Sequence, residues 1–286
     1  MSVPTPSVEA GGRSLKKSVI VGLLLGGAFL ASILIYPPAF MVLAAVAAGS
    51  GAWELSSALR KQDWHVPRIP VTVGSVIIMP VTFFGGPIAQ WLCALATVAS
   101  LIVWRIAQLA WDKAARGRSF TQTVLDFGAS AFVVIYLPLM TSFAMLILHM
   151  PKHGQGWVVT YVTTVAMIDT FGYLVGRKLG HVKIAPGVSP KKTLEGLLGS
   201  VAGGAAAAII GSLVLHRSIW FALLFAGAML LAAVFGDLAE SLIKRDLGVK
   251  DMSSWLPGHG GVMDRLDSIL PATLIAYILL SLPLPF

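Results

Sequence analysis

The sequence predicts an all-α, polytopic integral membrane protein with about nine transmembrane helices and a cytoplasmic N-terminus. Of the 286 residues, 56% are hydrophobic and 12% are charged, whereas a soluble globular domain has about 25% charged residues. The apolar segments are about 20 residues long, as an α-helix needs to cross a bilayer, and they do not alternate as membrane β-strands of about 10 residues do. In a membrane protein the positions of the charged residues along the chain are more informative than the net charge of +8. No nucleic-acid partner is expected.

The domain organisation is simple. Residues 1–12 are rich in Ser, Pro and Gly and are expected to form a disordered tail, while residues 13–286 are predicted to form a single transmembrane domain. The first apolar run ends at Pro37-Pro38 without a small-residue cleavage site, which favours a retained span over a signal peptide. The nine candidate spans are residues 14–36, 39–59, 71–88, 91–110, 123–149, 157–179, 197–215, 219–243 and 269–283.

The fifth candidate, residues 123–149, is longer than one span and contains Pro138. A proline inside a helix removes a backbone hydrogen bond and bends the axis. This segment is therefore expected to be kinked or to consist of two short pieces. Eight or ten spans are also compatible with the sequence.

The basic residues predict the orientation. With the N-terminus placed in the cytoplasm, 18 of the 21 Lys and Arg residues fall on the inner side. Lys152 and Arg217 fall on the outer side, and Arg105 lies within a span. Cytoplasmic loops are enriched in Lys and Arg. The distribution thus predicts a multi-pass protein of the cell (plasma) membrane whose polar loops face the cytoplasm.

The densest group of polar residues is the 241–267 segment, which directly follows an apolar span. It holds four basic residues, four aspartates and a histidine that has three glycines around it: Lys244, Arg245, Lys250, Arg265, Asp246, Asp251, Asp264, Asp267, His259, Gly258, Gly260 and Gly261. An ordinary cytoplasmic loop accounts for the basic residues but not for the aspartates or the adjacent glycines. Basic and acidic groups on a glycine-rich loop are suited to a polyphosphate and its metal ion.

Carboxylates also occur inside the apolar spans. An aspartate at the centre of a membrane helix costs about 2.5–3.5 kcal/mol, so Asp237 needs a partner or a water-filled cavity. Its helix face leads into the 241–267 segment and carries three more polar side chains: Glu240, Ser241 and Lys244. A structural ion pair with a nearby basic residue is the alternative explanation for Asp237. Glu54 and Asp126 are interpreted as helix-packing partners rather than catalytic groups.

A second polar segment, residues 189–196, reads S-P-K-K-T-L-E-G and follows a helix face that carries Asp169. The proline breaks the chain, and Thr193 with Glu195 can start the next helix. The free N–H groups of a helix start, flanked by Lys191 and Lys192, suit a phosphate. A basic loop beside a helix cap has a purely structural role about as often as it binds a phosphate.

Together these residues resemble the signature of the phosphatidate cytidylyltransferase family, whose members are also called CDP-diacylglycerol synthases. The resemblance covers residues 169–267, and the first five spans match only in hydrophobic character. The matching positions are Ser241, Lys244-Arg245, Lys250-Asp251, Pro257, His259-Gly260-Gly261, Asp264-Arg265 and Asp267, together with residues 189–196 and the G-D-x-x-E-S context of Asp237.

The resemblance implies transfer of a cytidylyl group from CTP to phosphatidic acid, giving CDP-diacylglycerol and pyrophosphate. The expected metal is Mg²⁺, with Mn²⁺ as an alternative, held by Asp237 and Asp264. A second, monovalent cation is left open, and a homodimer is compatible with the family. Asp237, Asp264, Lys244 and Arg265 are expected to be catalytic. The residues expected to bind substrate are Asp169, Ser189, Lys191, Lys192, Thr193, Glu195, Ser241, Arg245, Lys250, Asp251, His259, Gly260, Gly261 and Asp267.

Two alternative functions are weighed against this one. A CTP-dependent membrane lipid or polyprenol kinase would share the metal and nucleotide chemistry but would use an alcohol acceptor. The complete pattern over residues 241–267 favours the cytidylyltransferase. A cation transporter would explain carboxylates inside spans, but it would need charges along a path across the membrane, whereas nearly every charge here lies on the predicted inner half.

Overall fold

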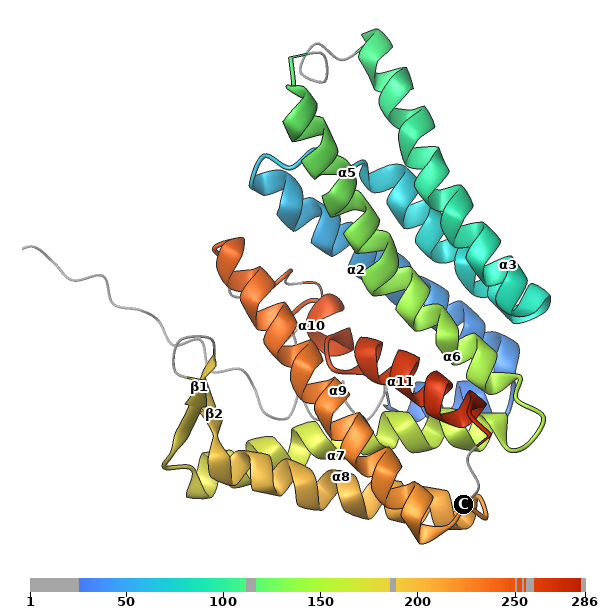
Figure 1. The fold of residues 1–286 in the computed structure, drawn as a ribbon, viewed down its shortest axis with the longest axis vertical. Coiled ribbons are helices and arrows are strands. Elements are labelled where there is room, and N and C mark those ends of the chain that lie inside the picture. The colour runs from blue at the N-terminus through green and yellow to red at the C-terminus, as the bar shows by residue number, and fades with distance from the viewer. Residues whose placement is uncertain are drawn as a thin grey trace, which may run out of the picture.

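The computed structural model describes residues 26–111, 117–185, 189–249, 251–253, 255 and 260–283. These residues are almost entirely helical (Figure 1), which confirms the predicted fold class. After a helix at residues 26–34, the elements are α2 (Pro37–Lys61), α3 (Arg68–Trp111), α5 (Phe120–Val134), the π-helix η1 (Ile135–Leu139), α6 (Met140–Leu148), α7 (Gly154–Leu179), β1 (Lys183–Ala185), β2 (Ser189–Thr193), α8 (Leu194–Val214), α9 (Ile219–Asp246), α10 (Met263–Leu266) and α11 (Ile269–Ser281).

Helix starts follow the local sequence. Pro37 and Pro38 occupy the first positions of α2, where a missing N–H costs no helix hydrogen bond. Ser119 and Gln122 form a reciprocal capping box at α5, and the side chains of Ser218 and Thr193 accept hydrogen bonds from the first turns of α9 and α8. The predicted helix start at Thr193 is therefore confirmed.

Helix α3 consists of two halves that run side by side (Figure 1). The backbone leaves the helical conformation at Gly86, whose φ of 69° is left-handed and is strained for residues with a side chain. The halves contact each other closely enough that a Cβ at Gly74 would collide with the side chain of Thr97. The predicted spans 71–88 and 91–110 thus correspond to the two halves.

Helices α5 and α6 form one apolar span of 29 residues with η1 between them. Pro138 lies within η1. It lacks an N–H group, and the π-helical segment adjusts the hydrogen bonding around it. The predicted irregularity in residues 123–149 is therefore a π-helical segment within a continuous helix and not a break into two pieces.

Six helices of the described residues are long and apolar enough to cross a membrane, counting α3 and the α5–η1–α6 unit once each. Helix α11 has 13 residues and falls short of a full span. Much of the predicted first span, and the whole tail at residues 1–12, lie outside the described residues. The expected number of nine spans stays a prediction.

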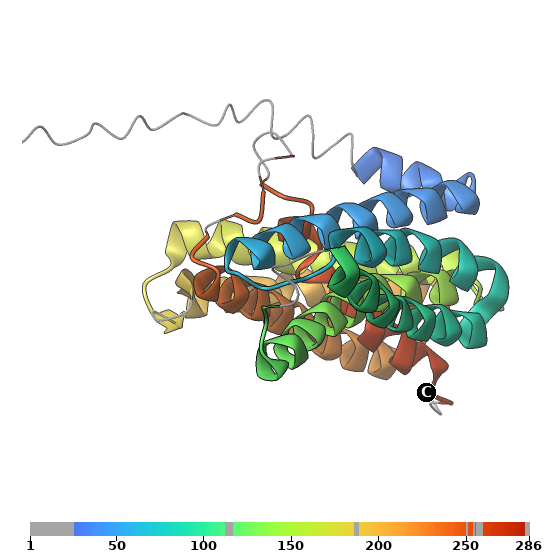
Figure 2. The same ribbon diagram turned by 90° about the horizontal axis from the view of Figure 1, so that it is seen from above.

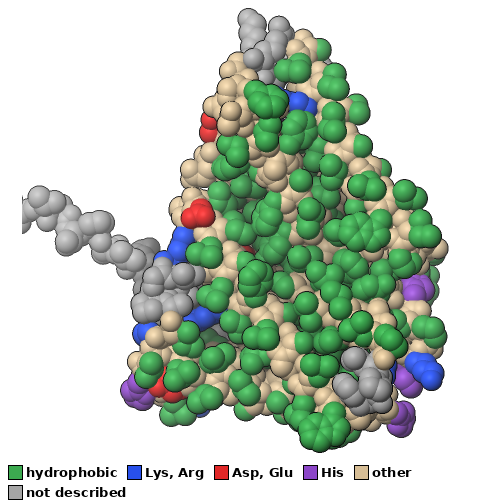
Figure 3. Space-filling model, viewed as in Figure 1, with side chains coloured by type: hydrophobic (Ala, Val, Ile, Leu, Met, Phe, Trp, Pro, Cys, Tyr) green, Lys and Arg blue, Asp and Glu red, His purple; other side chains and the backbone are tan. Residues whose placement is uncertain are grey.

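The loops assigned to opposite sides of the membrane gather at opposite ends of the bundle. At one end, Gln62 Nε2 donates to Leu247 O at 2.9 Å and the His65 N–H donates to Asp126 at 2.8 Å. At the other end, a pocket is lined by Gly86, Lys152, Arg217 and Ser281, among others. Figure 3 shows charged side chains near the edges of the molecule, with a broad apolar face between them. This arrangement fits a bundle that crosses a bilayer.

Helices α7 and α8 pack at unusually short range, and the β1–β2 hairpin connects them. A Cβ at Gly199 would approach Phe171 O to 2.7 Å, and one at Gly203 would approach Met167 O to 2.8 Å. The run of glycines and alanines at residues 196–211 thus lets α8 approach α7 closely. The hairpin pairs Lys183 with Thr193 and projects from one side of the bundle in both views (Figure 2). It was not predicted, because Ser189-Pro190 was interpreted only as a chain break.

We expect cysteines introduced at Lys61 and Asp246 to react with a membrane-impermeant maleimide from one side of the membrane, and a cysteine at Lys152 to react from the other. All three side chains are exposed, and they belong to opposite ends of the bundle. The measurement is labelling of inside-out and right-side-out vesicles in a Cys93→Ser background, since Cys93 is the single native cysteine. Labelling of all three positions from one side would contradict the fold as a membrane-crossing bundle.

Candidate active site

Lys244 links the end of α9 to α10. Its Nζ lies 2.9 Å from Glu240 Oε2, one helical turn back, and 3.0 Å from Asp264 Oδ1. The Glu240 side chain is fully buried, and that of Asp264 is 6% exposed. A buried charged group without an oppositely charged partner is energetically costly. The contacts therefore fix Lys244 between two carboxylates from different elements.

Asp264 also organises the turn in front of it. Its Oδ2 accepts hydrogen bonds from Gly261 N at 2.7 Å and from Met252 N at 3.1 Å. One side chain thus gathers the two ends of the loop and presents its other oxygen to Lys244. This turn therefore holds Asp264 against the end of α9.

Each glycine of the Gly260-Gly261 pair has its own geometric reason. Gly260 has a φ of 81°, in the left-handed region that favours glycine. Gly261 has the buried carboxylate of Glu54 against it, and an added Cβ would lie 2.6 Å from Glu54 Oε2. The pair therefore forms a specific turn rather than a loosely flexible one.

Glu54, on α2, is the residue that sequence reasoning missed. It is 2% exposed and accepts hydrogen bonds from Ser253 Oγ at 2.5 Å, Val262 N at 3.1 Å and Met263 N at 2.9 Å. Its partners are Ser253 and the first backbone N–H groups of α10, about 200 positions later in the chain. These bonds agree with the interpretation of Glu54 as a helix-packing partner rather than a catalytic group, but they join α2 to the start of a distant helix. Its only sequence signal is a carboxylate in an otherwise apolar segment.

The 189–196 segment meets α9 through one ion pair. Lys192 Nζ lies 2.5 Å from Asp237 Oδ2, and both side chains are partly exposed. The 189–196 segment therefore contacts the face of α9 that leads into the 241–267 segment. The ion pair proposed as the alternative explanation for Asp237 exists, and it joins Asp237 to a residue of the other polar segment.

The remaining side chains of the 189–196 segment shape the hairpin base. Thr193 Oγ1 accepts the Gly196 N–H at 3.1 Å. Glu195 accepts hydrogen bonds from His181 N at 3.0 Å and from Val182 N at 3.3 Å. Glu195 thus holds the turn that leads from α7 into β1. Ser189 and Lys191 lie in β2, but their side chains are outside the described part of the structure.

Further carboxylates lie beside Asp237. Asp169 has Asp267, Asp237 and Lys192 as charged neighbours and hydrogen bonds to Ser268. Asp267 accepts the Ser268 N–H at 2.7 Å. Burial raises the pKa of Asp267, and Asp237 raises it further, while the hydrogen bond from Ser268 and the charge of Lys244 oppose the shift. Negative charge is concentrated here beyond what the two neighbouring lysines balance.

The donor chemistry of this cluster fits a divalent cation. Buried Glu240 Oε1 has no hydrogen-bond donor within the described residues, and Glu240 has the carboxylate of Asp267 as a charged neighbour in addition to Lys244. Two adjacent carboxylates are stable with a shared proton or a cation between them. The described residues contain no preformed group of three His, Cys, Asp or Glu ligands. Asp237 and Asp264 lie at the two ends of the cluster, each already paired with a lysine.

A family model described as the cytidylyltransferase family matches residues 16–282. The chain belongs to this family. Its similarity to the phosphatidate cytidylyltransferase of Mycobacterium leprae is 34% identity over 289 residues, 99% of this chain and 92% of the relative. The phosphatidate cytidylyltransferases of Haemophilus influenzae and Bacillus subtilis are 29% and 27% identical, over 90% and 94% of this chain and 96% and 98% of their own lengths.

The other predicted site residues of this cytidylyltransferase are spread around the cluster. Ser241 is half-buried on α9, whereas Arg245, Arg265 and Asp251 are exposed. Lys250 and His259 lie outside the described residues. Two sets of ion pairs thus form the cluster, Lys192 with Asp237 and Lys244 with Glu240 and Asp264. The carboxylate of Asp267 is a charged neighbour of both sets.

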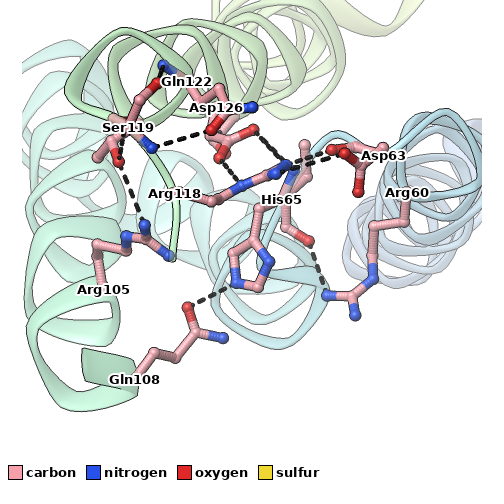
Figure 4. Close-up of polar contacts among 12 residues, drawn as sticks. Arg60, Asp63, His65, Arg105, Gln108, Arg118, Ser119, Gln122 and Asp126 are labelled. Atoms are coloured by element: carbon pink, nitrogen blue, oxygen red, sulfur yellow. Dashed lines mark hydrogen bonds and ion pairs between the residues drawn. The ribbon is translucent and has the colours of Figure 1, made fainter. Parts of the chain in front are cut away.

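The second buried carboxylate of the N-terminal half, Asp126, has a different surrounding (Figure 4). Arg118 Nε donates to Asp126 Oδ2 at 2.8 Å, and His65 Nε2 lies 2.9 Å from Gln108 Oε1. Arg118 also bonds to the backbone oxygen of Asp63. This network ties the loop before α3 to the start of α5. Asp126 is therefore a packing partner, as the sequence indicated.

Proposed function

We propose that this chain transfers the cytidylyl group of CTP to phosphatidic acid, giving CDP-diacylglycerol and pyrophosphate. The observation that carries the proposal is the Lys192–Asp237 ion pair, because it places the 189–196 segment against the helix face that leads into the 241–267 segment. The names of the related phosphatidate cytidylyltransferases support the choice of substrates.

The position of the cluster suits these two substrates. Phosphatidic acid presents its phosphate at the headgroup level of the membrane, whereas CTP arrives from the cytosol. The charged cluster lies at the end of α9, between an apolar helix and polar loops. We propose that this end faces the cytoplasm and that the protein resides in the plasma membrane, since nearly all basic residues belong to this side.

The reaction is an in-line displacement at phosphorus. A phosphatidate oxygen attacks the α-phosphorus of CTP, the bond from that phosphorus to the bridging oxygen breaks, and pyrophosphate leaves with the electron pair. Catalysis of this kind consists mainly of positioning and of neutralising charge. We assign phosphate binding to Lys192, Lys244, Arg245 and Arg265, and CTP binding to residues 189–193. The carboxylates around Lys244 orient its ammonium group before substrate arrives.

We assign Asp237 and Asp264 as ligands of Mg²⁺, or of Mn²⁺ in its place. When bound, the ion would neutralise charge on the triphosphate. Each carboxylate pairs with a lysine, Asp237 with Lys192 and Asp264 with Lys244. Asp237 and Asp264 would hold the ion, and the two lysines would hold phosphate oxygens beside it. The proposal extends to a homodimer.

The function is tested by incubating the purified protein in detergent with phosphatidic acid and CTP labelled with ³²P at the α-position. Cytidylyl transfer moves the label into lipid and releases unlabelled pyrophosphate. A CTP-dependent kinase would instead transfer the γ-phosphate, so label would enter the lipid only from γ-labelled CTP. The second outcome would replace the proposed reaction by phosphorylation of an alcohol.

We expect turnover to stop in excess chelator and to return with Mg²⁺, and we expect Asp237→Asn to lower kcat by at least about a hundredfold. Asparagine keeps the shape of the side chain but removes a charge that a divalent cation requires. The measurements are pyrophosphate release and the melting temperature of the purified variant. A loss of melting temperature in step with activity would instead assign Asp237 a structural role through Lys192.

We expect Lys192→Ala to raise the KM for CTP by about tenfold and to leave the KM for phosphatidic acid nearly unchanged. Lys192 lies on the hairpin that projects from the bundle, on the route of the soluble nucleotide. Steady-state kinetics with each substrate varied in turn will measure both constants. Lys152→Ala, at the opposite end of the bundle, is the matched control. A rise in the KM for the lipid alone would reverse the assignment.

A further inference from the structure

We propose that Glu54 is a positioning residue for the proposed cytidylyl transfer: it holds the turn at residues 260–263 so that Asp264 meets Lys244. The inference rests on the proposed function for its kinetic test, whereas its structural part can be measured without substrates. Glu54 belongs to α2, in the half of the chain that carries no other part of the polar cluster described above.

Its hydrogen bonds explain why a carboxylate is required there. Glu54 uses both oxygens to accept two consecutive backbone N–H groups, those of Val262 and Met263, and one of them also accepts Ser253 Oγ. A buried N–H without an acceptor is costly, and charged acceptors form the stronger hydrogen bonds. Only a side chain with two acceptor oxygens can satisfy all three donors.

The turn divides its N–H groups between two carboxylates. The Gly261 N–H donates to Asp264 Oδ2 at 2.7 Å, and the next two N–H groups donate to Glu54. Asp264 therefore depends on the same backbone that Glu54 fixes. The other oxygen of Asp264 lies 3.0 Å from Lys244 Nζ. Glu54 thus acts on the catalytic lysine through the turn and through Asp264, without contacting either substrate.

Gly261 gives independent support for this role. Only glycine lets the turn approach Glu54 so closely, because an added Cβ would lie 2.6 Å from Glu54 Oε2 and 3.0 Å from Glu54 Cδ. Helix α10 packs against α2 at the same place. The close approach therefore depends both on the glycine of the turn and on the position of the Glu54 carboxylate.

The first experiment compares Glu54→Gln with wild type and with Asp126→Asn. Asp126 is another buried carboxylate among the described residues of the N-terminal half, and it bonds to Arg118 and to the His65 N–H. Hydrogen exchange of residues 260–264, measured by mass spectrometry without substrates, reports whether the turn is held. Steady-state kinetics and melting temperature are measured on the same preparations.

In Glu54→Gln, an amide NH₂ faces backbone donors. We expect faster exchange of the 260–264 turn and a kcat lower by about ten- to a hundredfold, with the KM for CTP nearly unchanged. In Asp126→Asn, exchange of the turn should stay at its wild-type rate, even where the melting temperature falls. Glu54→Asp, which keeps the charge on a shorter side chain, should recover part of kcat.

The second experiment is a double-mutant cycle with Glu54→Ala and Gly261→Ala. If both act through one contact, the double variant should be no slower than the slower single variant, because removal of the Glu54 side chain makes room for the new methyl group. Multiplicative losses would show independent effects and overturn the proposal.

Three other results would also overturn it: unchanged exchange of the turn in Glu54→Gln, faster exchange with unchanged kcat, or a fall in kcat that matches the fall in melting temperature as in Asp126→Asn. Failure of the proposed function has a separate signature. The wild-type protein would then form no CDP-diacylglycerol, while the exchange data would still show whether Glu54 holds the turn.

Discussion

The ion pairs of Lys244 with Glu240 and Asp264 are the constraint on which the site depends. Transfer of an isolated ammonium or carboxylate out of water costs several kcal/mol even after the surroundings relax. One lysine between two carboxylates still leaves a net negative charge, which the N–H groups of Met252 and Gly261 partly compensate. The loop before α10 is therefore held against α9 by the need to neutralise charge at the end of a membrane helix.

Much of this arrangement could be predicted from local sequence. The apolar segments, the cap at Thr193, the irregularity at Pro138 and the close packing of the glycine-rich run all follow from residues within a few positions of each other. The contact of Asp264 with Lys244 on α9 is also a local one, because the glycines permit a tight turn and the two charged residues lie near each other in the sequence. Local propensity and short loops leave few alternatives in such segments.

The contacts that could not be predicted are those between distant segments. Glu54 is separated from Met263 by 209 positions, and a carboxylate in an apolar run can equally pair with an arginine, as Asp126 does. Periodicity is the same in both cases, so only the three-dimensional fold decides between them. The β1–β2 hairpin escaped prediction for a related reason. Its five- and three-residue strands are too short to show alternation, and their pairing depends on the ends of α7 and α8.

The packing of α7 against α8 determines where Lys192 can reach. Without side chains at Gly199 and Gly203, the two helices approach to backbone contact, and the hairpin between them stays narrow at its base. Glu195 then accepts hydrogen bonds from the backbone at His181 and Val182, which fixes the direction in which β2 enters α8. A side chain at either glycine would separate the helices and displace Lys192 from Asp237. Glycines buried among apolar helices thus help to set the geometry of a charged pair at the membrane edge. This coupling gives the apolar part of the fold a direct influence on the site.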